Sequence, residues 1–101
     1  MKLNIPYQVI KGAIYHMETY NKNIYINTLS LYKDIEGCEI NYLYDLCNNK
    51  QVLRDYKDAY RDVKTTLDVV KAVLHTQLMY FCNKHQLPIQ SYLNEIENLK
   101  I

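Results

Sequence analysis

Glycine, proline and long apolar runs are all scarce in this sequence. Its 101 residues include two Pro and only two Gly, Gly12 and Gly37. A Gly-rich phosphate-binding loop needs several glycines close together, so that kind of nucleotide site is excluded. The apolar runs fall far short of the roughly 18 residues that a membrane-spanning helix requires, and the first residues, MKLNIPYQVIKG, lack the apolar stretch of a signal peptide. We therefore expect an intracellular protein with no membrane partner.

An excess of one charge and a paired set of cysteines are lacking as well. The net charge is +1 and the pI about 7.7, so the molecule as a whole has no strong field to attract nucleic acid. Cys38, Cys47 and Cys82 are odd in number and lack metal-type spacing, which argues against a secreted disulfide framework. We expect reduced thiols and a cytoplasmic location, in the host cell if the protein is viral.

Apolar residues, in contrast, are plentiful. They make up 49% of the chain, which is enough to bury a core and too many for a disordered segment. The length suits one domain, residues 1–101. Ten Asn, ten Lys, ten Ile and eleven Tyr share A/T-rich codons, which suggests an accessory protein of a phage, a plasmid or another mobile element with an A/T-rich genome.

The spacing of apolar residues predicts helices along most of the chain. Pro6 suits a first helical turn and opens a helix over residues 6–22. Residues 24–30 alternate like a strand, but we favour a short helix that begins at Asn27 or Thr28 and stops near Gly37. A third helix ends at Asn48-Asn49, and Pro88 begins the last one. The predicted fold is all-α, an elongated bundle of four to five helices with one long helix in the C-terminal half.

That long helix, over residues 50–85, carries the clearest pattern. Apolar or uncharged residues step alternately by three and four, as heptad a and d positions do. They are Leu53, Tyr56, Tyr60, Val63, Leu67, Val70, Leu74, Gln77 and Phe81. Such a helix would be roughly 52 Å long, far more than a compact domain of this size spans. It therefore either breaks, at the β-branched pair Thr65-Thr66, or belongs to an elongated bundle or homodimer. We predict the elongated form.

A lysine stands at every seventh position beside this seam: Lys50, Lys57, Lys64 and Lys71. Lysines in such positions can simply cover apolar surface with their stems. They can also select an acidic protein partner, which is the prediction made here. The predicted partner-binding residues are the apolar Tyr56, Tyr60, Val63, Leu67 and Val70 and the basic Lys57, Arg61, Lys64 and Lys71. A nucleic-acid partner is the alternative for this Lys/Arg strip, residues 50–71, although four Asp interrupt it.

Two patterns bear on enzymatic function. The pairs Glu36-x-x-Glu39 and Asp55-x-x-Asp58 resemble the paired carboxylates of the all-helical nucleotide pyrophosphohydrolases of the MazG type. The resemblance covers these four positions, with Asp where that family begins its second pair with Glu, and it implies Mg²⁺-dependent hydrolysis. His75 and Cys82 are about 10.5 Å apart along a helix, too far for one zinc ion. We predict no cofactor, no metal and no enzyme activity.

The eleven tyrosines suit half-buried seams and binding surfaces, because each carries apolar area and a hydroxyl. We expect Tyr7, Tyr15, Tyr25, Tyr32, Tyr42 and Tyr92 to be exposed. Together these patterns predict a small non-enzymatic regulator or inhibitor that docks a protein partner on a helix face.

Overall fold

The computed structural model describes residues 5–20 and 39–99, and all regular structure in these two ranges is helical. The helices are α1 (Tyr7–Tyr20), α2 (Glu39–Cys47), α3 (Lys50–Ala59), α4 (Thr66–His85) and α5 (Gln90–Glu97). The prediction of an all-α bundle is confirmed, and its longest helix does lie in the C-terminal half. The short helix expected between Asn27 and Gly37 falls outside the described residues.

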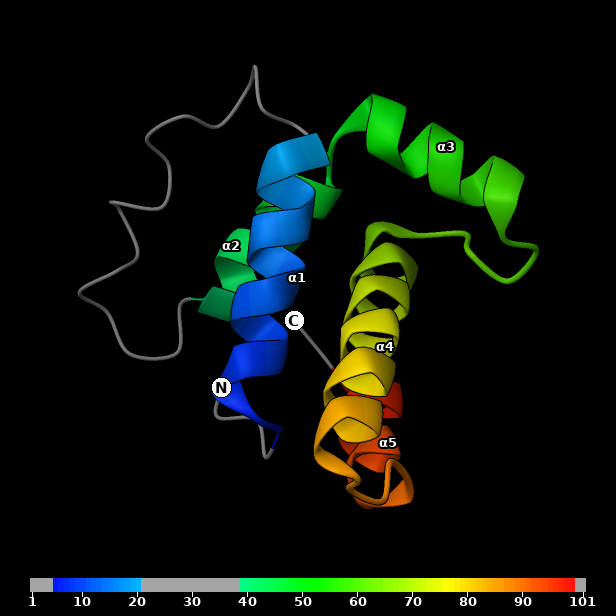
Figure 1. Ribbon diagram of the computed structural model, residues 1–101. Helices are drawn as coiled ribbons and strands as arrows, with labels where there is room; N and C mark the ends of the chain where they lie inside the picture. The colour runs from blue at the N-terminus through cyan, green and yellow to red at the C-terminus, as the bar shows by residue number, and fades with distance from the viewer. Residues whose placement is uncertain (1–4, 21–38, 100–101) are drawn as a thin grey trace.

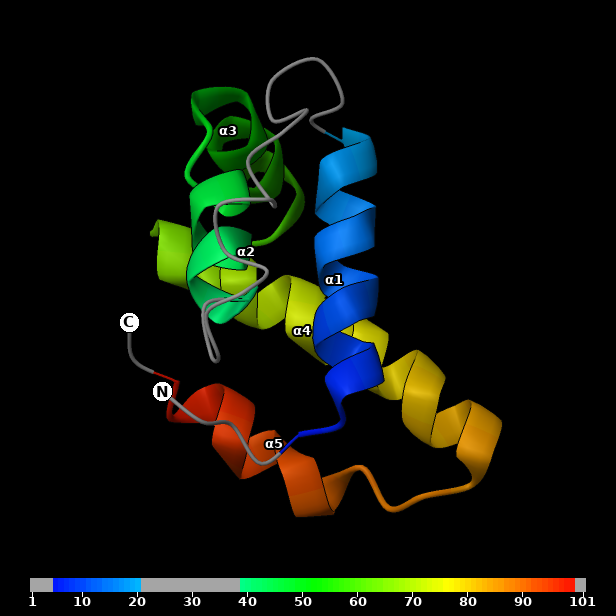
Figure 2. The ribbon, with the colours of Figure 1, turned by 90° about the vertical axis from the view of Figure 1, so that its left-hand side faces the viewer.

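Three helices form the centre of the bundle, because α1, α2 and α4 all pack against one another. In Figure 1, α1 and α4 stand side by side with α2 behind α1, while α3 crosses above the N-terminal end of α4. The turned view in Figure 2 shows α5 below α4, against which it packs. Within the described residues, no helix has both the length and the apolar character to cross a membrane.

The predicted continuous helix over residues 50–85 is wrong, because the chain leaves the helical conformation at Tyr60 (φ −130°, ψ 123°) and resumes it at Thr66. Thr65 begins α4 with a capping box, in which its side chain accepts from the Asp68 N–H and Asp68 accepts from the Thr65 N–H. Val63, in the connection, is buried in the core. The break proposed at Thr65-Thr66 is therefore the alternative that the structure bears out.

The break also corrects the predicted elongated shape. The molecule measures 36 × 35 × 24 Å, with a radius of gyration of 13.2 Å, which is the value expected for a compact domain of about 100 residues. Folding α4 back beside α1 and α2 removes apolar side chains from water that a straight helix would leave exposed.

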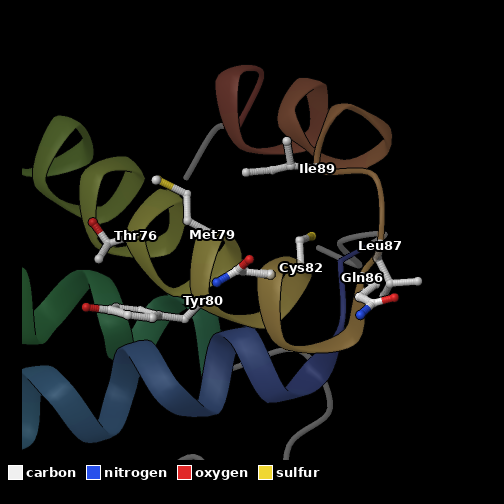
Figure 3. Close-up of a pocket in the computed structure, with 8 residues that line it drawn as sticks. Thr76, Met79, Tyr80, Cys82, Gln86, Leu87 and Ile89 are labelled. Carbon is white, nitrogen blue, oxygen red and sulfur yellow. The ribbon is translucent and has the colours of Figure 1, made fainter.

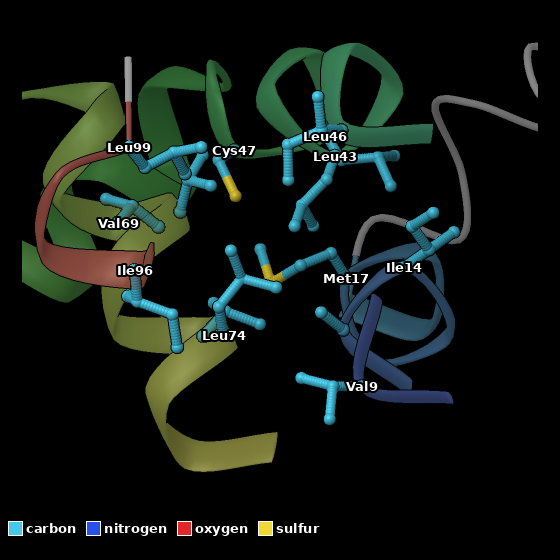
Figure 4. Packing of buried hydrophobic residues seen from close by; sticks show 14 of the residues in the cluster. Val9, Ile14, Met17, Leu43, Leu46, Cys47, Val69, Leu74, Ile96 and Leu99 are labelled. Atoms are coloured by element: carbon cyan, nitrogen blue, oxygen red, sulfur yellow. The ribbon is translucent and has the colours of Figure 1, made fainter. Parts of the chain in front are cut away.

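The core lies between α1, α2 and α4. At one side it is closed by residues near the end of the described chain. Figure 4 shows side chains of these three helices directed toward one centre, with Ile96 and Leu99 completing it. Tyr42 is fully buried, contrary to the expectation from its sequence pattern. Its hydroxyl donates to Glu18 Oε2 at 2.7 Å, so the buried polar group is satisfied. Tyr7 and Tyr15 are exposed as expected, and Tyr92 is half-buried.

Candidate functional site

The apolar residues predicted to contact a partner are divided between core and surface. Val70 is fully buried, Val63 is nearly so, and Leu67 packs against the core. These three side chains therefore stabilise the bundle and are not available to another chain. Tyr56 is half-buried, with its hydroxyl 3.9 Å from Met17 Sδ, whereas Tyr60 is 51% exposed. Of the five, Tyr60 is the one that projects most from the surface.

The predicted basic residues do not share one helix face. Lys50 and Lys57 lie on α3, Lys64 in the connection, and Lys71 on α4. The Lys71 Nζ donates to the Glu97 carbonyl at 3.1 Å, so this lysine ties α4 to the end of α5. The strip that would have met successive phosphates along one helix is thus broken into three segments, while nucleic-acid binding as such stays a prediction.

An aromatic corner connects α1 to the end of α3. The ring centroids of Tyr20 and Tyr56 are 6.4 Å apart, and those of Tyr56 and Tyr60 are 5.7 Å apart. The Tyr20 hydroxyl donates to Asp55 Oδ2, and this hydrogen bond raises the pKa of Tyr20. Burial raises the pKa of Tyr56 to about 12. Both phenols therefore stay protonated at neutral pH and act as hydrogen-bond donors.

An exposed apolar feature at the C-terminal end of α4 was not predicted from the sequence. On α4, Met79 is 53% exposed and Tyr80 is 70% exposed, and Leu87 projects from the turn that follows. With Thr76, Cys82 and Ile89 they line an open groove of about 640 Å³. Figure 3 shows Met79 on the side of α4 toward α5, and Tyr80 on the side toward α1. Apolar patches of this kind mark interaction sites more often than isolated exposed residues do.

Two smaller hollows continue this groove toward the aromatic corner. A cavity of about 280 Å³ is lined by His16 of α1, by Tyr56 and Tyr60, and by Thr76 and Tyr80 of α4. Tyr80 and Thr76 also line the groove, and Tyr60 also lines a hollow of about 350 Å³ on its other side. We call the continuous surface formed by Tyr60, Thr76, Met79, Tyr80 and Leu87 the α4 surface.

A signal for the α4 surface was present in the heptad pattern. With Tyr60, Leu67 and Leu74 at position a, Met79 falls at f, which faces away from the seam, and Tyr80 falls at the flanking position g. A methionine at f beside a tyrosine is an apolar pair on the outer side of the helix.

The residues singled out as possible metal ligands or nucleophiles have other roles or lie apart in the described part of the chain. There, no three His, Cys, Asp or Glu side chains are grouped to hold a metal ion. Asp55, of the pyrophosphohydrolase-like pairs, accepts hydrogen bonds from Tyr20 and Gln51, while Glu36 lies outside the described residues. Burial raises the pKa of the Cys47 thiol to about 12, so it is protonated and a poor nucleophile at neutral pH.

Comparison with known proteins adds no further assignment. No protein-family model matches the chain, and neither a curated protein nor a solved structure shows significant similarity to it.

Proposed function

We propose that this protein is a non-enzymatic binding protein, a regulator or inhibitor, that docks a protein partner on the α4 surface. The observation that carries the proposal is the exposure of Met79 and Tyr80 beside an open groove, on a helix whose Leu74 and Leu78 are fully buried. Burying such side chains against a partner supplies favourable free energy, and aromatic residues and methionine are enriched at interfaces.

The shape of the α4 surface favours a chain over a small molecule. From Thr76 to Leu87 it extends roughly 16 Å along the helix and the turn after it, and the hollow at Tyr60 lengthens it further. Small-molecule sites usually enclose most of the ligand, whereas this groove is open along its length. A partner segment lying along α4 would cover the whole surface at once.

The proposal keeps docking on a helix face as the mode of action, and it moves the binding surface from the heptad seam to the α4 surface. Tyr60 and the basic residues Lys57, Arg61 and Lys64 stay at the surface, and Arg61 lines a hollow together with Tyr60. Val63, Leu67 and Val70 are replaced as apolar anchors by Met79, Tyr80 and Leu87. Accessory proteins of phages and plasmids would act in this way by occupying a surface of their partner, without chemistry of their own.

The test is a selection from a displayed random-peptide library on the immobilised full chain. We expect the enriched peptides to bind the wild-type protein and to lose at least about tenfold in affinity on Tyr80→Asp, because a carboxylate replaces the apolar anchor. Tyr15→Asp is the matched control, since Tyr15 is exposed on α1 to nearly the same degree, 73% against 70%. Peptides that bind the two variants equally well would show that the α4 surface is not the binding site.

A further inference from the structure

The connection between α3 and α4, residues 60–65, is compatible with a helix by its sequence, although the structure shows a bend there. Its residues, YRDVKT, include no Gly and no Pro, the two residue types that disfavour a helix interior most. The heptad spacing passes through it without a shift, with Tyr60 at position a and Val63 at position d. The same residues therefore fit two conformations, a bend and a stretch of helix.

The bend leaves backbone groups without helical partners on both of its sides. An α-helix has unpaired carbonyls at its C-terminal end and unpaired N–H groups at its N-terminal end. Here α3 ends at Ala59 and α4 begins at Thr66, so both kinds of end lie within a few residues of each other. A straight helix would pair them, because each carbonyl would accept from the N–H four residues later.

The interactions that hold the bend are local. Val63 is buried in the core, and the capping box of Thr65 and Asp68 satisfies the start of α4. The Thr66 hydroxyl donates to Asn48 Oδ1 at 2.8 Å. Further along α4, the packing against α1 and α2 does not require that these helices belong to the same chain as α4.

The helices on the two sides of the bend form two parts. In the N-terminal part, α3 is joined to α1 through the hydrogen bond from the Tyr20 hydroxyl to Asp55 and through the Tyr56 hydroxyl, 3.9 Å from Met17 Sδ. In the C-terminal part, α5 packs against α4. Val52 is the one buried residue of α3, and in Figure 1 this helix crosses above the N-terminal end of α4. Straightening the bend would therefore disturb little of either part.

The seam residues of α3 and α4 already face the core. Leu53 and Tyr56 of α3 pack against it, and Val70 and Leu74 of α4 are buried within it. These positions belong to one heptad series, so they would lie along one face of a straight helix. The first half of that face would stay on the chain's own α1, and the second half would be free to pack on another copy.

We propose that two copies of this chain can exchange their C-terminal parts, with residues 60–65 straightened into a helix that joins α3 to α4. In the exchanged dimer, α4 and α5 of each copy pack against α1 and α2 of the other. The core contacts away from the bend are then remade between chains, which makes such an exchange a low-cost route to a dimer. The inference does not depend on the proposed function.

Protein that has not been unfolded stays a monomer, because α4 must leave α1 and α2 before the bend can straighten. Closure within one chain does not wait for a second chain, so it wins when folding takes place at low protein concentration. Exchange competes with it only when many chains fold together.

The test is refolding of the full chain from urea at several protein concentrations, followed by light scattering behind size exclusion. We expect a fraction with twice the mass of 12.1 kDa to grow with the protein concentration during refolding. It should persist on dilution, since separation requires unfolding. Arg61→Pro should lower this fraction at least about tenfold, because Pro breaks a helix interior, whereas Arg61→Ala should preserve or increase it.

Arg61 is suited to this test because Pro fits the bend at that position and not the helix. The Val63 N–H donates to the Tyr60 carbonyl at 3.3 Å, so Arg61 is the second residue of a four-residue turn, where Pro is favoured. Tyr60 has the extended conformation that a residue before Pro adopts. Arg61→Ala removes the same charge and favours a helix, which makes it the matched control.

The exchange is overturned if neither wild type nor Arg61→Ala gives a dimer at any refolding concentration, or if Arg61→Pro gives as much dimer as wild type. A dimer that dissociates on simple dilution, or that is lost on Tyr80→Asp, would be an ordinary surface association and would also contradict it. If Arg61→Pro does not fold, the cap variants decide. Thr65→Ala should then raise the dimer fraction above that of Thr65→Ser, and equal fractions would rule the exchange out.

Discussion

At the scale of single residues, the tyrosines show that the position of a side chain in the fold determines its burial more than its residue type does. Tyr42 is fully buried and donates to Glu18, whereas Tyr15 and Tyr80 are mostly exposed. Tyr56 is intermediate and pairs its ring with Tyr20 and Tyr60. A phenol can be buried only where its hydroxyl finds a partner, so one acidic neighbour decided the placement of Tyr42.

At Gly12 of α1, a side chain of α4 lies close to the helix backbone. A Cβ at Gly12 would lie 2.6 Å from Oε1 of Gln77, so the amide of Gln77 occupies the space that a side chain would take. We expect Gly12→Ala to stabilise the protein by about 1 kcal/mol in a Gln77→Ala background, because Ala favours the helix and the space is then free. In the wild-type background the gain should be smaller, because the amide must move.

The measurement is a double-mutant cycle by urea unfolding of the four proteins. A nonzero coupling between positions 12 and 77 is the expected result, and purely additive effects would contradict the close approach described above. A carboxamide at the end of a flexible side chain can rotate away, so we expect the Gly12→Ala protein to remain folded.

At the scale of elements, helix caps fix where the heptad region of the chain is divided into separate helices. Asn49 begins α3 by accepting from the Gln51 N–H at 2.8 Å and from the Val52 N–H at 3.3 Å. Thr65 and Asp68 form the capping box of α4, and Gln86 ends α4 in the left-handed conformation. Each cap satisfies backbone groups that the helix leaves unpaired at its ends.

Loss of the Thr65 cap should weaken the fold by a measurable amount. We expect Thr65→Ala to lower the free energy of unfolding by about 1 kcal/mol, as for other N-cap residues. Thr65→Ser keeps the hydroxyl that accepts from the Asp68 N–H and should lose much less. Equal losses in the two variants, measured by urea unfolding, would indicate that the cap itself contributes little.

Asp68, the acidic residue of the capping box, makes the stability that the cap contributes dependent on pH. The backbone N–H groups of Lys64 and Thr65 donate to Asp68 at 2.9 and 3.0 Å and hold the pKa of its carboxyl below the ordinary 3.8. A lowered folded-state pKa means that the contribution is present above the ordinary value and is lost as the pH falls through the folded one. The difference in stability between wild type and Asp68→Asn should therefore be largest at neutral pH and fade in acid.

At the scale of the whole molecule, the seam that pointed to a dimer is closed inside one chain. Val63, Val70 and Leu74 all belong to the core, and the extents of 36 × 35 × 24 Å are those of a compact bundle. The apolar area that would have formed a coiled-coil interface is already buried in the core of the single chain. What stays exposed is the smaller α4 surface.

We therefore expect the protein to be a monomer in solution. Light scattering behind size exclusion should give a mass near 12.1 kDa at every protein concentration tested. A dimer whose mass falls back to 12.1 kDa on Tyr80→Asp would mean that a second copy occupies the α4 surface. Tyr15→Asp again serves as the control.

The sequence by itself determined that this is a helical protein, and it located the ends of most described helices. Pro6 and Pro88 precede α1 and α5, Asn48-Asn49 separates α2 from α3, and the apolar spacing within each helix is local information. The helix starting near Asn27, the partner class and the absence of enzyme activity stay predictions.

Only the tertiary structure decided which apolar residues became core and which stayed exposed. The heptad spacing runs unchanged from Leu53 to Phe81, so it could not show that the chain turns between Tyr60 and Thr65. The turn lets residues of α4 pack against α1 and α2, whose contribution to burial is not encoded in the spacing of α4 itself. Burial is a property of all neighbours at once, and for that reason Val70 lies inside while Met79 and Tyr80 face outward.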